Sequence, residues 1–442
     1  MGTRQFLRDV QDNALATYRS EDFDSDIIDR RLLWRRTFVI NEPDGIRRVL
    51  LDNAANYRKS DLTRRLLEPG IGRGLLTSEG DTWRRHRRIM APAFDPRSVA
   101  GYASIMVEVV RELLERWRSL PKGDEIDIST EMMHTTLHII SRAMFSTDSD
   151  NIVEVVGRGV ENYQKSVRPT LLDFLGAPLW LRRIASPRRR IEALVAFGRA
   201  VDNLISSRQH KPDLHPRDLL SRLIRTRDSD GGAGMSAQEV RDQVVTIFMA
   251  GHETTAQALS WTFYLLATHR EVERKLHQEL SEALSRRSPS AEDLKRLPYT
   301  RMVIEESMRL YPPAHTMARQ ATAADRVLGR HIPAGATVLI SPWLLHRKPS
   351  LWSKPDRFDP ERFAPGAVSS RHRFAYIPFG AGQRICIGAA FAMQEAMVIL
   401  ALVAQNYTLR LKSGHPVEPQ GLITLRPRNG IRMLLERRTE AV

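Results

Sequence analysis

The chain has 442 residues, of which 42% are hydrophobic and 27% are charged. These fractions are typical of a globular protein and exclude a wholly disordered chain. A single cysteine excludes an intramolecular disulfide, which makes a reducing compartment the simpler environment. The formal net charge of +15 allows two readings: an ordinary solvated basic surface, or an acidic partner such as a small protein, a nucleic acid or an anionic membrane.

The sequence contains no pattern typical of export or membrane insertion. Its first residues carry charges and lack the apolar core of a signal peptide. The longest apolar run, 396–404, is far shorter than the ~20 residues that a spanning helix needs. We therefore expect a cytoplasmic protein without a transmembrane anchor.

The first half of the chain is predicted to be mostly helical. Residues 31–40 have the composition of a short strand, whereas 42–53 have helical spacing of apolar residues. Residues 96–225 are predicted to form amphipathic helices that are interrupted by proline-containing loops.

A long helix follows this region. Ser236 and Glu239 form a capping box, and apolar residues then continue through 240–266 without a proline. A helix so long and so apolar has to be buried in a soluble protein, so we expect it to form the spine of the fold.

The second half of the chain contains the predicted β portion. A helix over 299–310 precedes alternating, strand-like residues at 314–344, and residues 346–378 lack periodicity. Helical spacing returns over 388–403. The predicted fold class is therefore mainly α with a minor β portion.

The lone cysteine, Cys386, follows the long irregular segment. Three glycines within the stretch 379–388 allow the backbone to fold around the sulfur, and the helix that begins near Gly388 directs its positive end toward it. These features, with Arg384 nearby, favour a thiolate. Such a group could be a nucleophile or a metal ligand. Because no pattern identifies a general base and one cysteine cannot build a structural zinc site, an axial thiolate on haem iron is the remaining interpretation.

The stretch Phe379-Gly-Ala-Gly-Gln-Arg-Ile-Cys-Ile-Gly388 resembles the haem-thiolate loop of the cytochrome P450 family at every fixed position. The resemblance extends from about residue 31 to the C-terminus and is to the soluble bacterial type. It implies the P450 fold with the long helix over a haem b, Cys386 as the axial iron ligand, and Phe379 beside the cofactor.

Two further segments resemble the family's buried ion network. Glu306 and Arg309 are three residues apart on one helix, where an acid and a guanidinium can pair. Taken alone this spacing is equally typical of a surface salt bridge. The resemblance implies that Arg362, in Pro-Glu-Arg-Phe, joins this pair and fixes the irregular segment in a structural role.

The middle of the long helix resembles the family's oxygen groove. The small residues Ala250 and Gly251 are predicted to leave room beside the helix, and Glu253 and Thr254 place an acid beside an alcohol. The resemblance implies that Thr254 holds bound dioxygen and that Glu253 helps to relay protons to it. We expect the intervening His252 to pack rather than to bind.

Cations are expected around the haem carboxylates. Trp83 and Arg87 are four residues apart and share a helix face, and the resemblance implies that they bind the propionates together with Arg319 and Arg384. The neighbouring arginines are predicted to face outward, either as a solvated charge run or as a docking patch for an acidic electron donor. These neighbours are Arg84, Arg85 and Arg88.

The resemblance implies a monooxygenase that inserts one atom of O2 into an apolar C–H bond of a lipophilic molecule, such as a fatty acid or a terpenoid. It implies one monomeric domain over 1–442 with no fused reductase, so electrons come from a ferredoxin or flavodoxin with its reductase. The predicted substrate pocket is lined by Val245, Phe248, Met249, Ala314, Thr316, Met317, Leu422 and Ile423. We also expect a contribution from the region near 160–205.

Two alternatives remain open at this point. A peroxide-driven or isomerising haem-thiolate enzyme would need no electron donor, although such relatives usually lack the acid–alcohol pair that Glu253 and Thr254 form. A basic nucleic-acid-binding protein without catalysis is compatible with the charge, but the sequence contains no recognition motif and its basic residues are scattered. We therefore expect no nucleic-acid partner.

Overall fold

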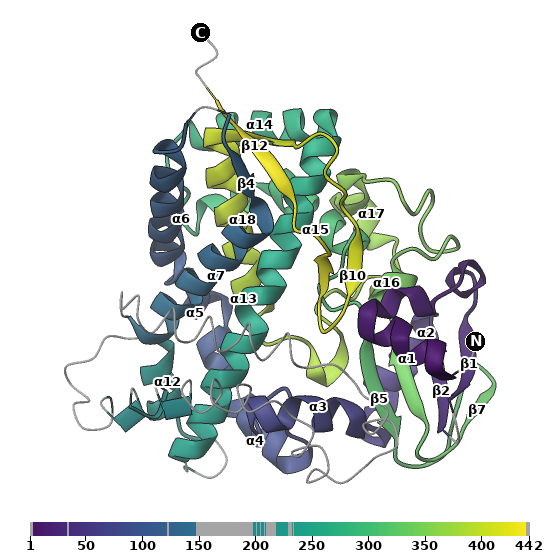
Figure 1. The fold of residues 1–442 in the computed structure, drawn as a ribbon. Helices are drawn as coiled ribbons and strands as arrows, with labels where there is room; N and C mark the ends of the chain where they lie inside the picture. Colours follow the sequence, from purple (N-terminus) through teal and green to yellow (C-terminus); the bar gives the residue numbers. More distant parts are fainter. Residues whose placement is uncertain are drawn as a thin grey trace.

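Figure 1 shows the computed structural model of the chain. It describes residues 3–32, 35–121, 123–146, 218–228 and 234–438, together with Gly232 and isolated positions between 198 and 208. Most of the region near 160–205, where we predicted a contribution to the substrate pocket, lies outside the described residues.

The described part of the chain is mainly α with a minor β portion, as the sequence predicted. The helices are α1 (Thr3–Asp12), α2 (Pro43–Arg47), α3 (Asp61–Ile71), α4 (Gly80–Met90), α5 (Pro96–Ala100), α6 (Ala103–Arg118), α7 (Ile128–Phe145), α12 (Leu219–Arg225), α13 (Ala237–Thr268), α14 (Arg270–Leu284), α15 (Pro298–Leu310), α16 (Pro342–Leu345), α17 (Pro365–Ser369) and α18 (Ala389–Asn406). The strands are β1 (Ile27–Leu32), β2 (Arg35–Ile40), β3 (Tyr57–Lys59), β4 (Glu125–Asp127), β5 (Met317–Ala321), β6 (Asp325–Val327), β7 (Arg330–Ile332), β8 (Thr337–Ile340), β9 (Tyr407–Leu411), β10 (Pro419–Gly421), β11 (Leu425–Pro427) and β12 (Arg432–Arg437).

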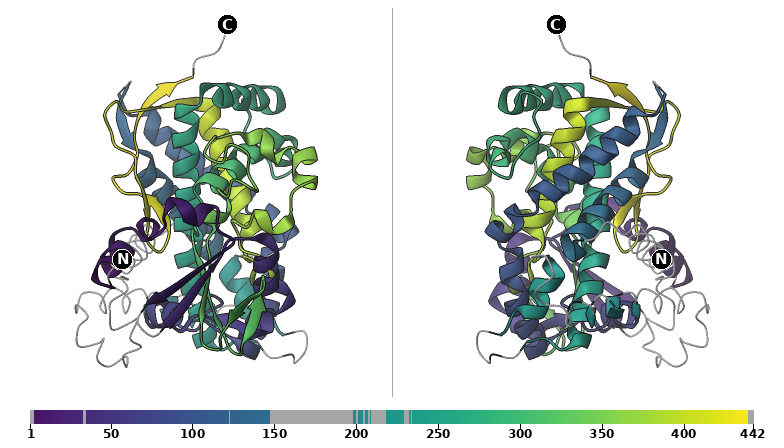
Figure 2. Two further views of the ribbon diagram at one scale, coloured as in Figure 1. Left: turned by 90° about the vertical axis from the view of Figure 1, so that its right-hand side faces the viewer. Right: turned by 90° about the vertical axis from the view of Figure 1, so that its left-hand side faces the viewer.

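Helix α13 is the predicted spine of the fold. It has 32 residues and runs through the helical part of the molecule in both Figure 1 and Figure 2. The predicted capping box is present, since the Glu239 N–H donates to the Ser236 hydroxyl at 3.2 Å and the Ser236 N–H donates to the Glu239 carboxylate at 2.7 Å. Most of its apolar residues are buried, so tertiary packing adds to the stability that the cap provides.

A second buried helix, α18, follows the cysteine loop. By length and hydropathy it could cross a membrane, but 61% of it is buried inside the protein, where it packs against α6, α13, α14 and α15. It is therefore a core helix of the fold.

The larger part of the β portion lies to one side of the helices, beside α1 and α2, whereas β4 and β12 lie near α18 at the top of the view (Figure 1). Its main sheet has the order β1-β2-β8-β5-β3, and only the β2–β8 pair is parallel. A smaller sheet, β4-β12-β9, joins the C-terminal strand to the start of α7, and β10 and β11 form a hairpin that contacts α13.

Two local predictions differ from the structure in detail. The short strand region predicted over 31–40 contains the end of β1 and all of β2, which pair in antiparallel orientation. The helix predicted over 42–53 is α2 followed by a wider turn at Arg48–Asp52. In both places short apolar runs fit more than one backbone path, and pairing with neighbouring elements decides among them.

Helix α4 is joined to the cap of α13 by charged side chains. Arg85 Nη1 donates to Glu239 at 2.7 Å, and the buried His86 lies 3.1 Å from the same carboxylate oxygen. Burial would raise the pKa of Glu239, but the Ser236 N–H, His86 and Arg85 together outweigh it and lower the pKa to about 2. The carboxylate therefore stabilises the folded chain.

We expect Glu239→Ala to lower the free energy of unfolding by about 1–2 kcal/mol at neutral pH, because a capping box and an ion pair are lost. The wild-type advantage should be complete above pH 4.5 and should shrink as the pH falls toward about 2, since the folded pKa lies below the ordinary value. Urea unfolding at several pH values measures this. Gln238→Ala, on the same turn, is the control, and a difference that does not change with pH contradicts the prediction.

The hairpin of β6 and β7 contains a strained residue. Val327 pairs with Arg330, so Leu328 and Gly329 form a two-residue loop with φ values of 47° and 77°. Such loops favour asparagine followed by glycine, because a left-handed leucine costs ~1 kcal/mol or more. We expect Leu328→Asn to raise the free energy of unfolding by ~0.5–1 kcal/mol in urea titrations. A variant that is less stable than the wild type would show that packing of Leu328 over Gly45 outweighs the strain.

Candidate active site

The candidate site is built around the loop that carries Cys386. Gly380 and Gly382 have φ values of 73° and 69°, and a methyl group on Gly382 would collide with the Leu50 carbonyl oxygen. These positions therefore require glycine. The Cys386 N–H donates to the Phe379 carbonyl at 2.9 Å, which folds the loop back on itself.

The sulfur of Cys386 lies in a mixed environment. Cys386 is exposed to solvent, although many protein atoms surround its thiol. Burial raises the pKa of the Cys386 thiol, and the Gly388 N–H and the Arg87 guanidinium lower it by less. The Gly388 N–H and a nearby cation thus act in the predicted direction, toward the thiolate, although burial of the anion opposes them more strongly.

The middle of α13 has an exposed face between two largely buried stretches of the helix. Ala250 is exposed and Thr254 is half-buried, although most residues on either side of them are buried. The Thr254 hydroxyl donates to the Ala250 carbonyl at 2.7 Å, so both residues lie on one face of the helix. This face is where the sequence predicted room beside the helix.

Gly251 lies on a different face from Ala250. A methyl group added to Gly251 would contact Ile140 of α7 at 3.9 Å, an ordinary van der Waals distance. Gly251 is half-buried, and Ile140 of α7 bounds the space that the sequence predicted beside it. His252 is buried, and its Nδ1 lies 2.6 Å from the Phe248 carbonyl oxygen.

The acid of the predicted pair faces the C-terminal hairpin. The Glu253 side chain is buried, and its Oε1 accepts a hydrogen bond of 2.6 Å from the Thr424 hydroxyl. Burial raises the pKa of Glu253, while Thr424 and the Arg426 charge oppose that shift. Sequence reasoning missed Thr424, because 171 residues separate the two partners.

Three basic side chains converge between the sheet and the cysteine loop. Lys59 and Arg319 are directly opposite each other on β3 and β5, where like charges repel. Burial and the Arg384 charge lower the pKa of Lys59 to about 7 and that of Arg319 to about 10. We refer to Lys59, Arg319 and Arg384 as the cation trio. Sequence reasoning missed Lys59, since an isolated lysine at a strand end carries no signal.

Arg384 shows that the cation trio is short of negative charge. It pairs with Glu79, and its guanidinium lies 4.3 Å from the centre of the Trp83 ring. Its Nη1 atom is buried and has no hydrogen-bond partner among the described residues. A buried donor without a partner is costly, so this place suits a carboxylate ligand.

Arg87 holds the cysteine loop from α4. Its Nη1 donates to the Ile385 carbonyl at 2.8 Å, one residue before Cys386. The outward orientation predicted for the neighbouring arginines is only partly correct. Arg84 and Arg88 are exposed, and Arg88 also forms two hydrogen bonds with Asp228, whereas Arg85 is half-buried and reaches Glu239.

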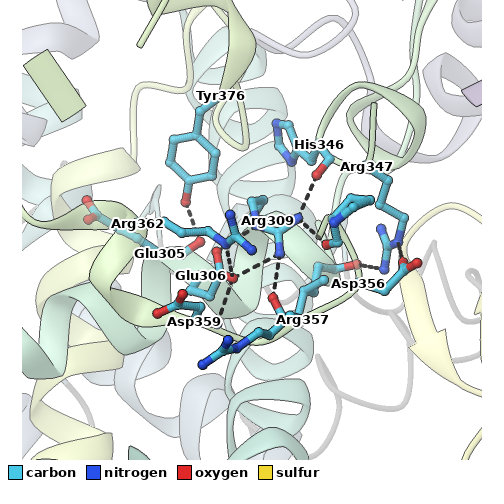
Figure 3. A network of polar contacts seen from close by, with 12 residues as sticks. Glu305, Glu306, Arg309, His346, Arg347, Asp356, Arg357, Asp359, Arg362 and Tyr376 are labelled. Carbon is cyan, nitrogen blue, oxygen red and sulfur yellow. Dashed lines mark hydrogen bonds and ion pairs between the residues drawn. The ribbon is translucent and has the colours of Figure 1, made fainter. Parts of the chain in front are cut away.

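The predicted ion network joins α15 to the irregular segment that precedes the cysteine loop (Figure 3). Arg309 donates to both oxygens of Glu306, at 2.6 and 2.9 Å, and both side chains are fully buried. The guanidinium of Arg362 lies 3.3 Å from Glu306, and the Asp359 N–H donates to the same carboxylate at 2.9 Å. Three groups, one on α15 itself and two from a distant segment, thus surround one carboxylate.

Arg309 also binds the irregular segment directly. Arg309 donates to the backbone carbonyls of His346, Pro355 and Arg357 at 2.7, 2.7 and 3.0 Å. Burial raises the pKa of Glu306, and Arg309 opposes that shift. Removing one partner of such a network typically costs about 3–5 kcal/mol, because a charge is left buried and unpaired.

The residues predicted to line the substrate pocket fall into three groups. Ala314 and Ile423 are exposed, whereas Val245 and Phe248 are buried. The other four are half-buried: Met249, Thr316, Met317 and Leu422. Phe248 points into the core, where its ring stacks on Phe145 with centroids 5.2 Å apart. Successive residues on a helix point about 100° apart, so Met249 can face the open side while Phe248 cannot.

Comparisons with known proteins agree with this geometry. The family profile of Cytochrome P450 matches residues 13–433. A cyclooctatin synthase of Streptomyces melanosporofaciens is 35% identical over 408 residues, which cover 90% of this chain and 86% of that protein. A cyclooctat-9-en-7-ol 5-monooxygenase of the same organism is 37% identical and covers 87% and 83%, respectively. A putative cytochrome P450 132 of Mycobacterium bovis is 34% identical and covers 94% and 91%.

The family implies a haem-thiolate cofactor, and the residues present fit such a group. Cys386 offers an accessible sulfur, and the buried Arg384 Nη1 and the cation trio match carboxylates. The described residues contain no group of three or more His, Cys, Asp or Glu side chains that could hold a metal ion. The chain belongs to the cytochrome P450 family and is a monooxygenase.

Proposed function

We propose that the protein binds haem b through Cys386 and hydroxylates an apolar C–H bond of a lipophilic, terpenoid-type substrate. The observation that carries this proposal is the accessible Cys386 sulfur in a loop that Arg87 fixes, beside buried cations that lack sufficient negative charge. The substrate class is supported by two relatives whose names describe steps on a cyclooctatin-type skeleton.

Each part of the site has a distinct task in this proposal. When bound, the haem supplies oxygen activation and the thiolate of Cys386 supplies electron density. The propionates are bound by the cation trio, with Trp83 and Arg87 on the facing helix and Phe379 beside the ring. Ala250 leaves space for dioxygen on the open face of α13.

Thr254 and Glu253 are proposed to handle protons. The Thr254 hydroxyl, on the open face of α13, can release its bond to the Ala250 carbonyl and donate toward dioxygen. Burial raises the pKa of Glu253, so its carboxyl can hold a proton. The Thr254 hydroxyl then passes this proton on toward dioxygen. Glu306, Arg309 and Arg362 take no part in the chemistry and hold the segment before the cysteine loop.

The substrate is proposed to contact the apolar side chains that remain accessible. These are Met249, Ala314, Met317, Leu422 and Ile423, with Thr316 and the largely buried Val245 beside them. Apolar walls with few polar groups are typical of pockets for lipophilic molecules.

Members of the family need O2 and an electron donor in general. We propose that a ferredoxin or flavodoxin with its reductase supplies the electrons in the cytoplasm. Arg84 is exposed on α4, the helix whose Arg87 contacts the cysteine loop, so an acidic donor could approach there.

The first test examines the thiolate. We expect purified protein that is reduced and exposed to carbon monoxide to show the Soret band of thiolate-ligated haem, and Cys386→Ser to lose it. Terpenoid alcohols should shift the spin state of the wild-type haem. A wild-type protein that binds no haem, or that keeps a nitrogen-ligated spectrum, would contradict the proposed function.

The second test examines Lys59. Because its pKa lies at about 7 in the chain, Lys59 is largely neutral in alkaline solution, and binding an anionic propionate requires it to take up a proton. We expect the haem affinity of the apoprotein to fall as the pH rises above 7, and Lys59→Met to bind about tenfold more weakly at neutral pH with a flatter pH profile. Lys295→Met, at an exposed site, is the control. An unchanged affinity and profile in Lys59→Met would show that this lysine does not contact the propionates.

A further inference from the structure

The turn between β10 and β11 is held on several sides. Gly421 pairs with Leu425, so Leu422, Ile423 and Thr424 form a three-residue loop. At its base, the Leu425 N–H donates to the Pro313 carbonyl at 2.9 Å. We refer to residues 421–425 as the C-terminal turn.

Two buried rings fix the path of the C-terminal turn. The Trp261 ring N–H donates to the Leu425 carbonyl at 3.2 Å, which ties the turn to α13. The buried His315 places its Nε2 2.8 Å from the Leu422 carbonyl oxygen, and burial lowers the pKa of this histidine, so the neutral ring donates there. A methyl group on Gly421 would lie within 3.3 Å of both Leu15 and His315, so the backbone fits closely against them.

The side chains of the turn point in two directions. Ile423 is 40% exposed and Leu422 is half-buried, which leaves an apolar tip on the outside of the turn. Thr424 is buried on the other side, and its hydroxyl donates to Glu253 at 2.6 Å. One short loop therefore carries two side chains of the proposed substrate pocket and the hydrogen-bond donor of the proposed proton-handling acid.

The C-terminal turn connects its apolar tip to Glu253 through its backbone as well as through the Thr424 hydrogen bond. Because the loop has only three residues and is anchored at both ends, we expect pressure on its apolar tip to reach Thr424 as well. The Glu253 carboxyl then loses or changes its hydrogen bond to Thr424. Because a buried carboxyl without a hydrogen-bond partner is costly, it reorients toward another partner. Thr254 is the adjacent residue on the helix.

We propose that Thr424 is a positioning residue that holds the Glu253 carboxyl, so that substrate contact with Leu422 and Ile423 changes the position of the acid. The inference rests on the proposed function of Glu253 and of the pocket. It gives the enzyme a way to keep its acid restrained until a substrate touches the turn.

Infrared difference spectroscopy of the haem-loaded protein tests the restraint without turnover. The carbonyl stretch of protonated Glu253 is identified by its loss in Glu253→Gln, and Glu395→Gln identifies the band of another buried acid, which Thr255 of α13 contacts. We expect Thr424→Val to move the Glu253 band to higher frequency, because a donor to that carboxyl is lost. Thr424→Ser should leave the band in place.

A matched control separates this effect from the loss of any buried hydroxyl. Thr262 is a buried threonine on α13 whose hydroxyl donates to the Ala258 carbonyl, so Thr262→Val should leave the Glu253 band unchanged. A wild type without a band that Glu253→Gln removes, or a band that does not move in Thr424→Val, overturns the proposal.

The coupling to substrate is tested with the same band. A terpenoid alcohol that shifts the haem spin state should also shift the Glu253 band in the wild type, and the shift should be smaller in Ile423→Ala. In turnover, Thr424→Val should form ~5–10-fold less product per reducing equivalent and Thr424→Ser should restore it, compared with a ~100-fold loss in Glu253→Gln.

The outcomes separate this proposal from the proposed function. A substrate that shifts the spin state without moving the band overturns the role of Thr424 and leaves the monooxygenase intact. Absence of a thiolate-type spectrum in the wild type instead overturns the proposed function itself.

Discussion

The site depends on one buried ion network. The residues before the cysteine loop form short turns and irregular backbone over a long stretch, and such backbone has many groups that need partners. Arg309 supplies several of them at once, because its guanidinium binds Glu306 on one side and three backbone carbonyls on the other. The charge of Arg309 is tolerated because Glu306 balances it, and Glu306 is in turn held by Arg362 and the Asp359 N–H. The buried pair therefore holds the segment that leads into the cysteine loop.

Charge is distributed very differently around the cation trio than in the Glu306–Arg309 network. Lys59, Arg319 and Arg384 lie together with Glu79, so positive charge exceeds negative charge in a largely buried place. The same kind of residue thus has two functions within one fold. In the buried network, Arg309 is matched by the Glu306 carboxylate and organises the backbone. In the cation trio, positive charge is only partly balanced by negative charge. This is costly for the chain alone and suits the binding of a dianionic ligand.

Helix α13 combines rigidity with an exposed centre. Its cap and its packing fix the ends, while Ala250 and Thr254 expose the middle of one face. Residues on the other faces connect outward: Thr136 of α7 donates to the His252 carbonyl, and Thr424 reaches Glu253. The acid and the alcohol of the proposed pair therefore belong to different surroundings, one buried against the C-terminal turn and one on the open face. This division allows events at the turn to reach the acid without disturbing the helix.

The sequence by itself determined those features that arise from interactions within a few residues. The capping box at Ser236, the apolar run of α13, the glycine-rich loop around Cys386 and the mainly helical class could all be predicted, because caps, periodicity and glycine conformations are local. Only the tertiary structure decided which distant side chains meet: that Lys59 lies opposite Arg319, that Thr424 binds Glu253, and that Phe248 turns into the core. Such contacts depend on how elements far apart in the chain pack together, and short-range patterns carry no information about that packing.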